Sequence, residues 1–252
     1  MAAEWPVGLP TRLRPLELVG EGTSGTVWRA RDRRHGRDVA VKVLRSGGPR
    51  RSELHRDRLE LEGRALARLR DVPGIVTVHE LGVTAAGTGW LVTEFVDAGS
   101  LADRGPGSMT ADELVPIAIV LATSLAEVHA REVVHGDLSP ANLLVDDEGH
   151  PRLADFGLAV LREQRRHPGG LTPAYAAPER LAGAPPSPAG DVYALAASLA
   201  WVLSPFDTGS AGALAAARDP DPAARPDARA FGALLAARQR AGGPGRRSRR
   251  GR

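Results

Sequence analysis

The sequence predicts an α+β fold in two lobes: a small β-rich lobe with one main helix, followed by a larger, mostly helical lobe. The first third holds short segments rich in β-branched and apolar residues, separated by turns that contain Gly, which is typical of strands. From Asp97 onward, helical patterns dominate instead. The chain has 252 residues, of which 42% are hydrophobic, so it can bury a sizeable core.

The small lobe (N-lobe) is expected over residues 12–96. Its strands are predicted at 12–20, 26–31, 38–44, 75–83 and 90–96. Between the third and fourth strands, Leu residues from Leu54 to Leu69 recur among Arg and Glu, which predicts a helix that ends at Pro73-Gly74. The flexible run at 97–100 then predicts a hinge at about 94–99.

The large lobe (C-lobe) is expected over residues 100–240. Thr110 and Glu113 form a capping-box pattern that opens a helix to about Glu132, although Pro116 inside it conflicts with a regular helix. Ala-rich helical patterns follow at 214–217 and 228–240.

The two ends of the chain are expected to lie outside this domain. Residues 1–11 are predicted to form an N-terminal extension and residues 241–252 a basic tail, which carries much of the formal net charge of +3. An Arg-rich terminus of this kind is commonly solvated and disordered. Weak contact of the tail with nucleic acid or anionic lipid is the alternative.

Composition excludes several classes of site. The chain has no Cys, which rules out disulfides, thiolate catalysis and Cys-based zinc sites, and which fits a cytoplasmic location. The N-terminus lacks the charged and apolar regions of a signal peptide. The apolar stretch from Val192 to Leu203 is shorter than the roughly 20 residues of a membrane span, so no transmembrane segment is expected.

Lys42 is the single Lys among the 33 Lys and Arg residues. A Lys that persists in such an Arg-rich chain indicates a site that needs a compact point charge rather than a planar guanidinium. Upstream lies a glycine-rich segment, whose backbone can approach phosphate oxygens closely because Gly lacks a Cβ. It consists of Gly20, Glu21, Gly22, Thr23, Ser24, Gly25, Thr26 and Val27. Its place between two predicted strands disfavours a dinucleotide-binding fold, in which the segment opens a helix.

Two further clusters carry oxygen ligands and a candidate base. The first runs from His135 through Asp137 to Asn142, and the second is Asp155-Phe156-Gly157. Asp and Asn oxygens suit Mg²⁺, which binds few protein ligands together with substrate phosphates. Two acids, an Asn, a Gly-rich loop and a Lys are the components that phosphoryl transfer uses.

In this order, the motifs resemble those of the eukaryotic-like Ser/Thr protein kinases of bacteria, over roughly residues 12–240. The motif Ala177-Pro178-Glu179 completes the resemblance. It implies a bilobal kinase fold, ATP with Mg²⁺ (or Mn²⁺) as cofactors, and transfer of the γ-phosphate to a Ser or Thr hydroxyl of a protein substrate.

The resemblance also implies a role for each site residue. Asp137 would be the base, while Asn142 and Asp155 would hold the metal. Lys42 would bind phosphates and pair with Glu62, with Glu60 as the alternative partner. The residues implied around adenine are Val27, Ala40 and Leu144 at its faces, Glu94 and Val96 at the hinge, and Thr93 as gatekeeper.

Further residues would organise the site. Thr172 would bond Asp137, and Asp191 would brace the catalytic loop. Glu179 would pair with Arg225. Leu66, His135 and Phe156 would form a stack that links the lobes.

Three positions depart from the family pattern. Ser139 replaces the usual Lys, and loss of such a donor costs about 2.7–4 kcal/mol of barrier. Gly136 replaces an Arg that in many kinases pairs with a phosphorylated activation loop, and residues 158–171 contain no Ser, Thr or Tyr. We therefore expect no control by phosphorylation within that segment. The stretch from Ser204 to Arg225 is short, which predicts a reduced substrate-docking surface.

Two alternative functions stay open from sequence. A pseudokinase that binds nucleotide as a scaffold fits Ser139 and the short C-lobe, while intact Lys42 and Asp137 oppose it. A kinase for a small hydroxyl compound fits the pattern from His135 to Asn142, and the Ala177-Pro178-Glu179 motif opposes it.

Overall fold

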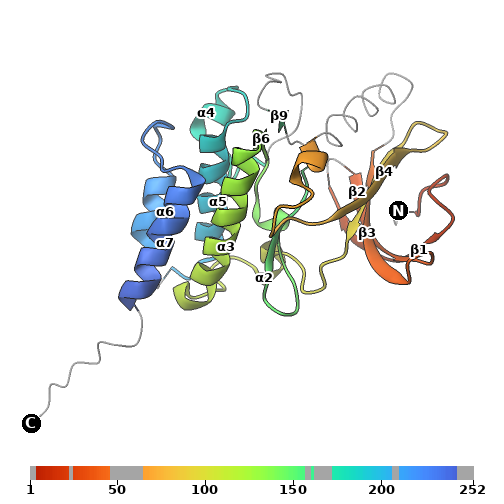
Figure 1. Ribbon diagram of the computed structural model, residues 1–252, viewed down its shortest axis with the longest axis horizontal. Coiled ribbons are helices and arrows are strands. Elements are labelled where there is room, and N and C mark those ends of the chain that lie inside the picture. The colour runs from red at the N-terminus through yellow and green to blue at the C-terminus, as the bar shows by residue number, and fades with distance from the viewer. Residues whose placement is uncertain are drawn as a thin grey trace, which may run out of the picture.

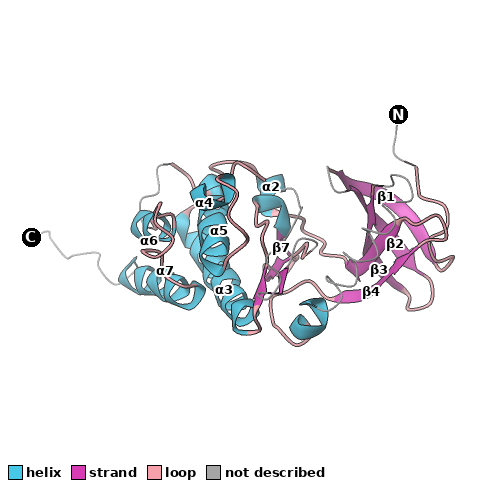
Figure 2. Cartoon of the chain, turned by 90° about the horizontal axis from the view of Figure 1, so that it is seen from above, coloured by secondary structure: helices cyan, strands magenta, loops and turns pink. Residues whose placement is uncertain are grey.

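A computed structural model of the chain describes residues 4–22, 25–45, 65–156, 160–161, 172–205 and 210–242. A sheet forms one lobe and helices form most of the other (Figures 1 and 2). The N-lobe sheet has five strands in the order β1-β2-β3-β5-β4, and each neighbouring pair is antiparallel. The strands are β1 (Leu13–Glu21), β2 (Gly25–Asp32), β3 (Arg37–Leu44), β4 (Val78–Val83) and β5 (Gly89–Glu94).

Strand β3 shows how the sequence places side chains on the two faces of this sheet. Val39, Val41 and Val43 alternate along it and are buried in the N-lobe core. Because side chains of a strand alternate between faces, Ala40 and Lys42 lie on the opposite face. The alternation of this one strand therefore supplies both core residues and a candidate phosphate ligand.

Residues before β1 contribute to the N-lobe core. Leu9 is buried in the same cluster as the β3 valines, and Trp5 packs against that cluster. The Trp5 and Trp28 rings meet edge to face, with centroids 5.6 Å apart. The expected domain boundary at residue 12 therefore does not mark the edge of the packed lobe.

The C-lobe begins after the hinge with helices α2 (Leu101–Arg104) and α3 (Ala111–Ala130). Short strands and a 3₁₀ turn follow: β6 (Val133–Val134), η1 (Pro140–Asn142), β7 (Leu143–Val145), β8 (Pro151–Leu153) and β9 (Val160–Leu161). The remaining helices are α4 (Pro178–Leu181), α5 (Pro188–Val202), α6 (Ala211–Ala217) and α7 (Ala228–Gly242). Strands β6 and β9 pair with each other, as do β7 and β8, and both pairs are antiparallel.

Helix α3 is the central helix of this lobe. The predicted capping box is confirmed, because the Thr110 side chain accepts from the Glu113 backbone and the Glu113 side chain accepts from Thr110. Pro116 lies inside the helix without ending it. By length and composition alone, α3 is long and apolar enough to cross a membrane. Its apolar composition is explained by the C-lobe core, which holds α3 residues from Leu114 to Val128.

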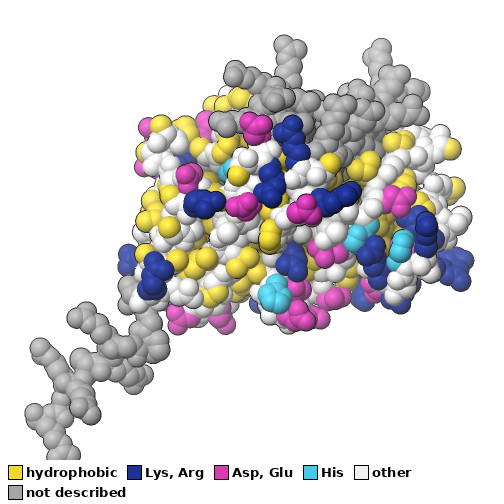
Figure 3. Space-filling model, in the orientation of Figure 1, with side chains coloured by type: hydrophobic (Ala, Val, Ile, Leu, Met, Phe, Trp, Pro, Cys, Tyr) yellow, Lys and Arg dark blue, Asp and Glu magenta, His cyan; other side chains and the backbone are white. Residues whose placement is uncertain are grey.

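The described surface mixes both signs of charge. On the face shown in Figure 3, basic and acidic side chains lie interleaved along the middle of the molecule rather than gathered by sign. Described residues of opposite charge also form ion pairs, including Arg152 with Asp146 and Arg131 with Glu127. The predicted basic tail lies outside the described residues beyond Gly242.

Candidate active site

The loop between β6 and β7 carries the first group of candidate residues. Asp191, which is buried at the start of α5, accepts hydrogen bonds from the backbone N–H groups of His135 and Gly136, each at 2.8 Å. Its carboxylate also lies 2.9 Å from Nε2 of His129. The predicted bracing of this loop by Asp191 is thus confirmed, and it fixes the backbone just before Asp137.

His135 connects the loop to the segment that carries Asp155. The His135 side chain is fully buried, with Nε2 2.9 Å from the carbonyl oxygen of Ala154. Its ring also packs against the Phe156 ring, with centroids 4.6 Å apart and the planes tilted by 53°. The predicted contact between His135 and Phe156 is thus confirmed. Leu66 packs against the C-lobe core, and its direct contact with Phe156 stays a prediction.

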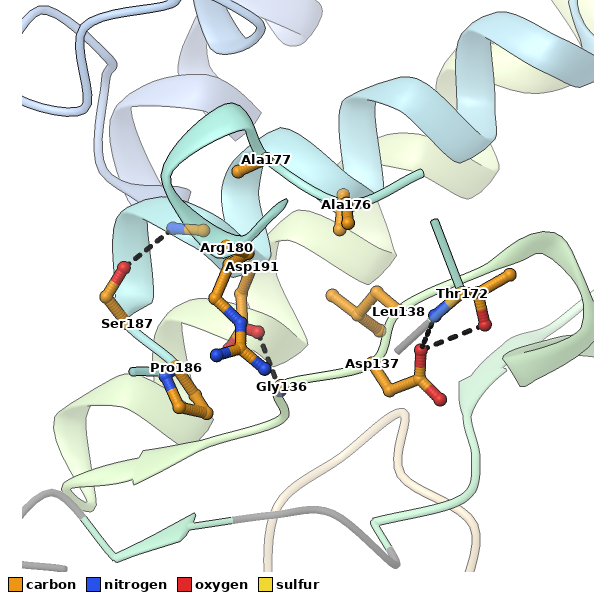
Figure 4. A pocket seen from close by; sticks show the side chains of 12 residues that line it. Gly136, Asp137, Leu138, Thr172, Ala176, Ala177, Arg180, Pro186, Ser187 and Asp191 are labelled. Atoms are coloured by element: carbon orange, nitrogen blue, oxygen red, sulfur yellow. Dashed lines mark hydrogen bonds between the residues drawn. The ribbon is translucent and has the colours of Figure 1, made fainter. Parts of the chain in front are cut away.

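Asp137 is oriented by Thr172. The backbone N–H and the hydroxyl of Thr172 both donate to Oδ1 of Asp137 at 2.9 Å (Figure 4). This contact was predicted from the resemblance and is confirmed. Because two donors hold one oxygen, the carboxylate has a fixed orientation in the cleft.

Asn142 and Asp155 carry the candidate oxygen ligands for a metal ion, and they lie on neighbouring segments because the Ala154 N–H donates to the Asn142 carbonyl at 2.9 Å. The Asn142 side chain donates from Nδ2 to the carbonyl oxygen of Asp137 at 2.8 Å, which leaves the amide oxygen as the atom that can bind a cation. Asp155 follows β8 with a φ of 60°, in the left-handed region that few non-Gly residues adopt. An amide oxygen and a carboxylate are hard ligands, so this pair fits a divalent cation such as Mg²⁺.

Lys42 reaches across from the N-lobe to this group. Its Nζ lies 2.5 Å from Oδ1 of Asp155, and the Lys42 side chain is 14% exposed. The predicted partner Glu62, and the alternative Glu60, lie outside the described residues. Lys42 is thus bonded to Asp155, and Asn142 to Asp137. The two pairs are connected through the backbone, because the Ala154 N–H donates to the Asn142 carbonyl oxygen at 2.9 Å.

The glycine-rich segment forms the turn between β1 and β2. Gly22 and Gly25 close it with a hydrogen bond from the Gly22 N–H to the Gly25 carbonyl at 2.9 Å. A Cβ at Gly25 would lie 2.0 Å from the Val43 carbonyl oxygen, so this position requires Gly. At Gly20 and Gly22 a Cβ would meet nothing within 4 Å, which leaves their backbone open to a ligand. Thr23 and Ser24 lie outside the described residues.

Arg45 supports this turn and was missed by the sequence reasoning. Its Nε donates to the Gly22 carbonyl at 3.0 Å, and its guanidinium lies 3.3 Å from the Glu21 carboxylate. An Arg at the end of a strand carries no motif, so no sequence signal singled it out among so many Arg residues.

The predicted adenine-site residues lie where β3, β5 and β7 meet the hinge. Strand register places Ala40 beside Thr93 and Val27 beside Lys42. Leu144 packs against a small apolar cluster formed by Val76, Val96 and Ala154. The sequence reasoning missed Val76 and Ala154, since isolated small apolar residues do not stand out from the core pattern.

The hinge residue Glu94 is already engaged by its neighbours. Its backbone N–H bonds the Thr77 carbonyl at 2.9 Å, and its side chain accepts from the Thr77 N–H at 2.8 Å. The Thr93 hydroxyl donates to the Glu94 carbonyl oxygen at 3.0 Å. A carbonyl has two lone pairs, so this oxygen can still accept from an adenine amino group.

Comparison with known proteins decides the family. The family model for the protein kinase domain matches residues 13–210, which contain both of these pairs. The chain belongs to the protein kinase domain family.

The kinase domain has relatives among bacterial proteins. It is 40% identical over 200 residues to the DNA damage-responsive serine/threonine-protein kinase RqkA of Deinococcus radiodurans, which covers 76% of this chain and 29% of RqkA. It is 38% identical over 197 residues to PknK of Mycobacterium tuberculosis H37Rv, covering 75% and 17% of the two chains. For PkaA of Streptomyces coelicolor the identity is 37% over 241 residues, covering 82% and 41%. The chain thus spans less than half the length of each of these relatives.

Ser139, which departs from the family pattern, is buried in the kinase domain. It is 5% exposed and precedes η1, where its carbonyl accepts from the Asn142 N–H at 2.9 Å. Its side chain makes no capping bond to η1. A buried hydroxyl cannot supply the positive charge that a Lys brings to this position.

A buried ion pair connects two segments of the C-lobe. Arg225 donates in a bidentate manner to Glu179, at 2.6 and 2.8 Å, and its side chain is fully buried. This confirms the predicted pair. The hydrogen bonds from Arg225 lower the pKa of Glu179, although burial partly opposes the shift. The pair ties α4 to the segment before α7.

Proposed function

We propose that this kinase domain transfers the γ-phosphate of ATP to a Ser or Thr hydroxyl of a protein substrate. The observation that carries the proposal is the pairing of Lys42 with Asp155 and of Asn142 with Asp137, with a backbone bond from Ala154 to Asn142 between the two pairs. These are the residue types that phosphoryl transfer needs for positioning, charge neutralisation and proton acceptance. The three relatives described above, RqkA, PknK and PkaA, are serine/threonine-protein kinases, which supports the same substrate class.

Asp137 is proposed as the group that receives the substrate proton. The acceptor hydroxyl oxygen attacks the γ-phosphorus, and the bond from that phosphorus to the β–γ bridging oxygen breaks. The bridging oxygen keeps the bonding electrons and leaves with ADP, while the hydroxyl proton passes to the Asp137 carboxylate. Thr172 holds Oδ1 by two hydrogen bonds, so the second carboxylate oxygen is the one available to the hydroxyl.

The N-lobe residues are proposed to hold the nucleotide. Lys42 would neutralise phosphate charge, and Glu62 is proposed as its ion-pair partner. The backbone at Gly20, Gly22 and Gly25 would bind the phosphates, and Glu21, Thr23 and Ser24 belong to the same motif. Val27, Ala40 and Leu144 sandwich the adenine, while Thr93, Glu94 and Val96 line its edge.

Asn142 and Asp155 would hold Mg²⁺, or Mn²⁺ in its place. When bound, such a cation neutralises phosphate charge that would otherwise repel the incoming hydroxyl. The amide oxygen of Asn142 is fixed for this role, because its Nδ2 is already bonded to the Asp137 carbonyl.

A pseudokinase is the second candidate function, and buried Ser139 is the observation that favours it. The loss of a donor that stabilises the transferring phosphate slows chemistry by about 10²–10³ without removing the base or the metal ligands. A kinase for a small hydroxyl compound is less favoured, because the chain carries the Ala177-Pro178-Glu179 motif and pairs its Glu179 with Arg225, as the resemblance to protein kinases implies.

Control of the enzyme is also part of the proposal. The segment 158–171 lies outside the described residues apart from β9, so the expected independence from phosphorylation there rests on its lack of Ser, Thr and Tyr. We also propose that the protein is cytoplasmic and that the Arg-rich tail, residues 241–252, binds nucleic acid or anionic lipid weakly. The reduced docking surface is consistent with α6, which has seven residues and begins at Ala211.

The test is transfer of labelled γ-phosphate from ATP with Mg²⁺ to generic protein substrates and to small hydroxyl compounds. Asp137→Asn should abolish transfer to protein while nucleotide binding persists. Asp147→Asn is the matched control, because Asp147 is an exposed residue of the β7–β8 turn. Nucleotide binding without transfer to any acceptor would establish the pseudokinase, and transfer to small compounds alone would establish the third function.

A further inference from the structure

A small hollow lies beside Asp137, between the catalytic loop and the N-terminal end of α5 (Figure 4). Gly136, Leu138, Ala176, Arg180, Pro186 and Ser187 are among the residues that line it. It encloses about 20 Å³, which is room for little more than one water molecule. Gly136 has a φ of 83°. Many kinases carry an Arg at this position, and because Gly136 has no side chain, the hollow stays open here.

Arg180 brings a positive charge to the hollow. It lies in the last turn of α4, and its Nη1 donates to the Ala184 carbonyl at 2.5 Å. This bond anchors the guanidinium at the rim, and Figure 4 shows it directed towards Gly136 and Pro186. A guanidinium has five N–H donors, so one such bond leaves most of them for a ligand.

The neighbouring carboxylates are engaged elsewhere. Glu179 is bonded by both nitrogens of the Arg225 fork, and Asp191 accepts from two backbone N–H groups and lies against His129. Among the residues that the structure describes, none forms an ion pair with Arg180 within 4.0 Å. Its charge does help to lower the pKa of nearby Glu179, but no described carboxylate takes up its free N–H donors, so these can bind an acidic group that enters from outside.

Ser187 adds a second donor. Its Oγ accepts from the Gly190 N–H at 3.0 Å as the N-cap of α5, so the hydroxyl proton can point to a ligand in the hollow. The positive end of the α5 dipole adds to the attraction of a negative charge at this point.

We propose that Arg180 and Ser187 form a subsite for the carboxylate of an Asp or Glu in the protein substrate, close in sequence to the acceptor Ser or Thr. This rests on the proposed function. In Figure 4 Arg180 and Asp137 lie on opposite sides of the hollow. When the acceptor Ser or Thr of the substrate lies at Asp137, the acidic residue bound by Arg180 must therefore be a near neighbour of that acceptor in the substrate sequence. A hollow with room for about one water molecule can admit a carboxylate oxygen but not an aromatic ring, so the methylene stem of the acidic residue stays at its mouth.

The experiment compares synthetic peptides that have one Ser acceptor and differ at one neighbouring position, where Glu, Gln or Lys is placed in turn. The readout is the ratio of kcat/KM for the Glu and Gln peptides at each position. The wild type should favour Glu by about tenfold at one position, as expected for a charge-assisted hydrogen bond at a partly exposed site. Arg180→Gln should bring the ratio close to one, and Arg180→Glu should favour Lys at the same position.

Two further variants sharpen the test. Ser187→Gly removes the hydroxyl but keeps an acceptable N-cap, and it should lower the ratio at that position. Arg229→Gln, on an exposed residue that pairs with Glu127 away from the hollow, should keep the wild-type ratio.

The outcomes separate the two proposals. Equal transfer to Glu and Gln peptides at every position, or a preference that Arg180→Gln leaves intact, would overturn the subsite while the proposed function stands. Absence of transfer to every peptide and protein would overturn the proposed function and the subsite with it.

Discussion

Lys42 of β3 and Asp155 after β8 are in direct contact, with Nζ 2.5 Å from Oδ1, although 113 residues separate them in the chain. This contact joins the N-lobe sheet to the segment that carries a candidate metal ligand. It places the proposed phosphate-binding group and the proposed metal-binding group within reach of one nucleotide.

Lys42→Arg should lower kcat/KM for protein phosphorylation by about 10² or more, because removal of one preorganised cation costs several kcal/mol of transition-state stabilisation. The guanidinium keeps the charge, but its planar fork does not fit a position built for a compact ammonium. Steady-state kinetics with saturating Mg²⁺ measures the effect. Near-normal kinetics in this variant would contradict the proposed role of Lys42.

Thr172 is expected to act by positioning Asp137. Thr172→Val removes the hydroxyl donor while the backbone N–H bond stays, and it should lower kcat by about tenfold, the value of one charge-assisted hydrogen bond. Thr172→Ser retains the donor and is the matched control. Equal losses in the two variants would show that the contact serves packing rather than orientation.

The same contact predicts the effect of charge at Thr172. A phosphate there would face the Asp137 carboxylate, so like-charge repulsion should suppress activity rather than raise it. Mapping of phosphosites on protein incubated with ATP, together with the activity of Thr172→Glu, measures this. A stoichiometric phosphate on Thr172 that accompanies higher activity would refute the expected independence from phosphorylation.

Ser139→Lys should raise kcat, because it returns a positive charge to the catalytic loop beside the transferring phosphate. The gain expected from one restored donor is about 10²-fold. Ser139 is 5% exposed, so a longer side chain must displace its neighbours or point into the cleft. Ser139→Met has similar length without charge and separates the two effects. A gain that Met reproduces would mean that packing, not charge, limits the reaction.

The strands of the N-lobe could be predicted from sequence because their alternation is local. Val39, Val41 and Val43 repeat every second residue, and β3 begins one residue before the predicted 38–44 and ends with it. The short strands β6 to β9 were not predicted, since each has two or three residues and holds barely one repeat. The predicted strand at 75–83 begins at Val78, although Ile75 forms an isolated bridge with Leu153.

In the candidate site, too, residues in short motifs could be predicted from sequence, whereas contacts between distant segments could not. Asp137, Asn142 and Asp155 belong to short motifs with fixed spacing, so the sequence could name them. The direct bond from Lys42 to Asp155 and the place of Arg180 beside Gly136 depend on how distant segments meet. Trp5 and Leu9 contribute to the N-lobe core, yet they occur in a stretch without periodicity, and the sequence therefore suggested an extension.

Glu179→Gln should destabilise the C-lobe by about 3 kcal/mol, because it leaves the Arg225 guanidinium buried without its charged partner. Glu127→Gln is the control. Glu127 forms exposed pairs with Arg131 and Arg229, and loss of such pairs should cost less than about 1 kcal/mol. Urea denaturation of both variants measures the free energy of unfolding. Equal costs in the two variants would contradict the structural weight assigned to the Glu179–Arg225 pair.

Asp32 should make the N-lobe sensitive to acid. It is buried at the end of β2, with Oδ2 2.8 Å from Nδ1 of His35 and Oδ1 accepting from the Arg34 N–H at 3.0 Å. Burial would raise the pKa of Asp32, but these hydrogen bonds outweigh burial and lower the pKa from 3.8 to about 2. Because the folded-state pKa is the lower one, the stabilisation is present above about pH 4 and is lost as the pH falls towards 2.

Asp32→Asn should therefore be less stable than the wild type by about 1–2 kcal/mol at neutral pH. The difference should shrink between pH 4 and 2, as measured by denaturation at each pH with exposed Asp71→Asn as control. A difference that stays constant over that range would show that the Asp32 carboxylate does not titrate with unfolding.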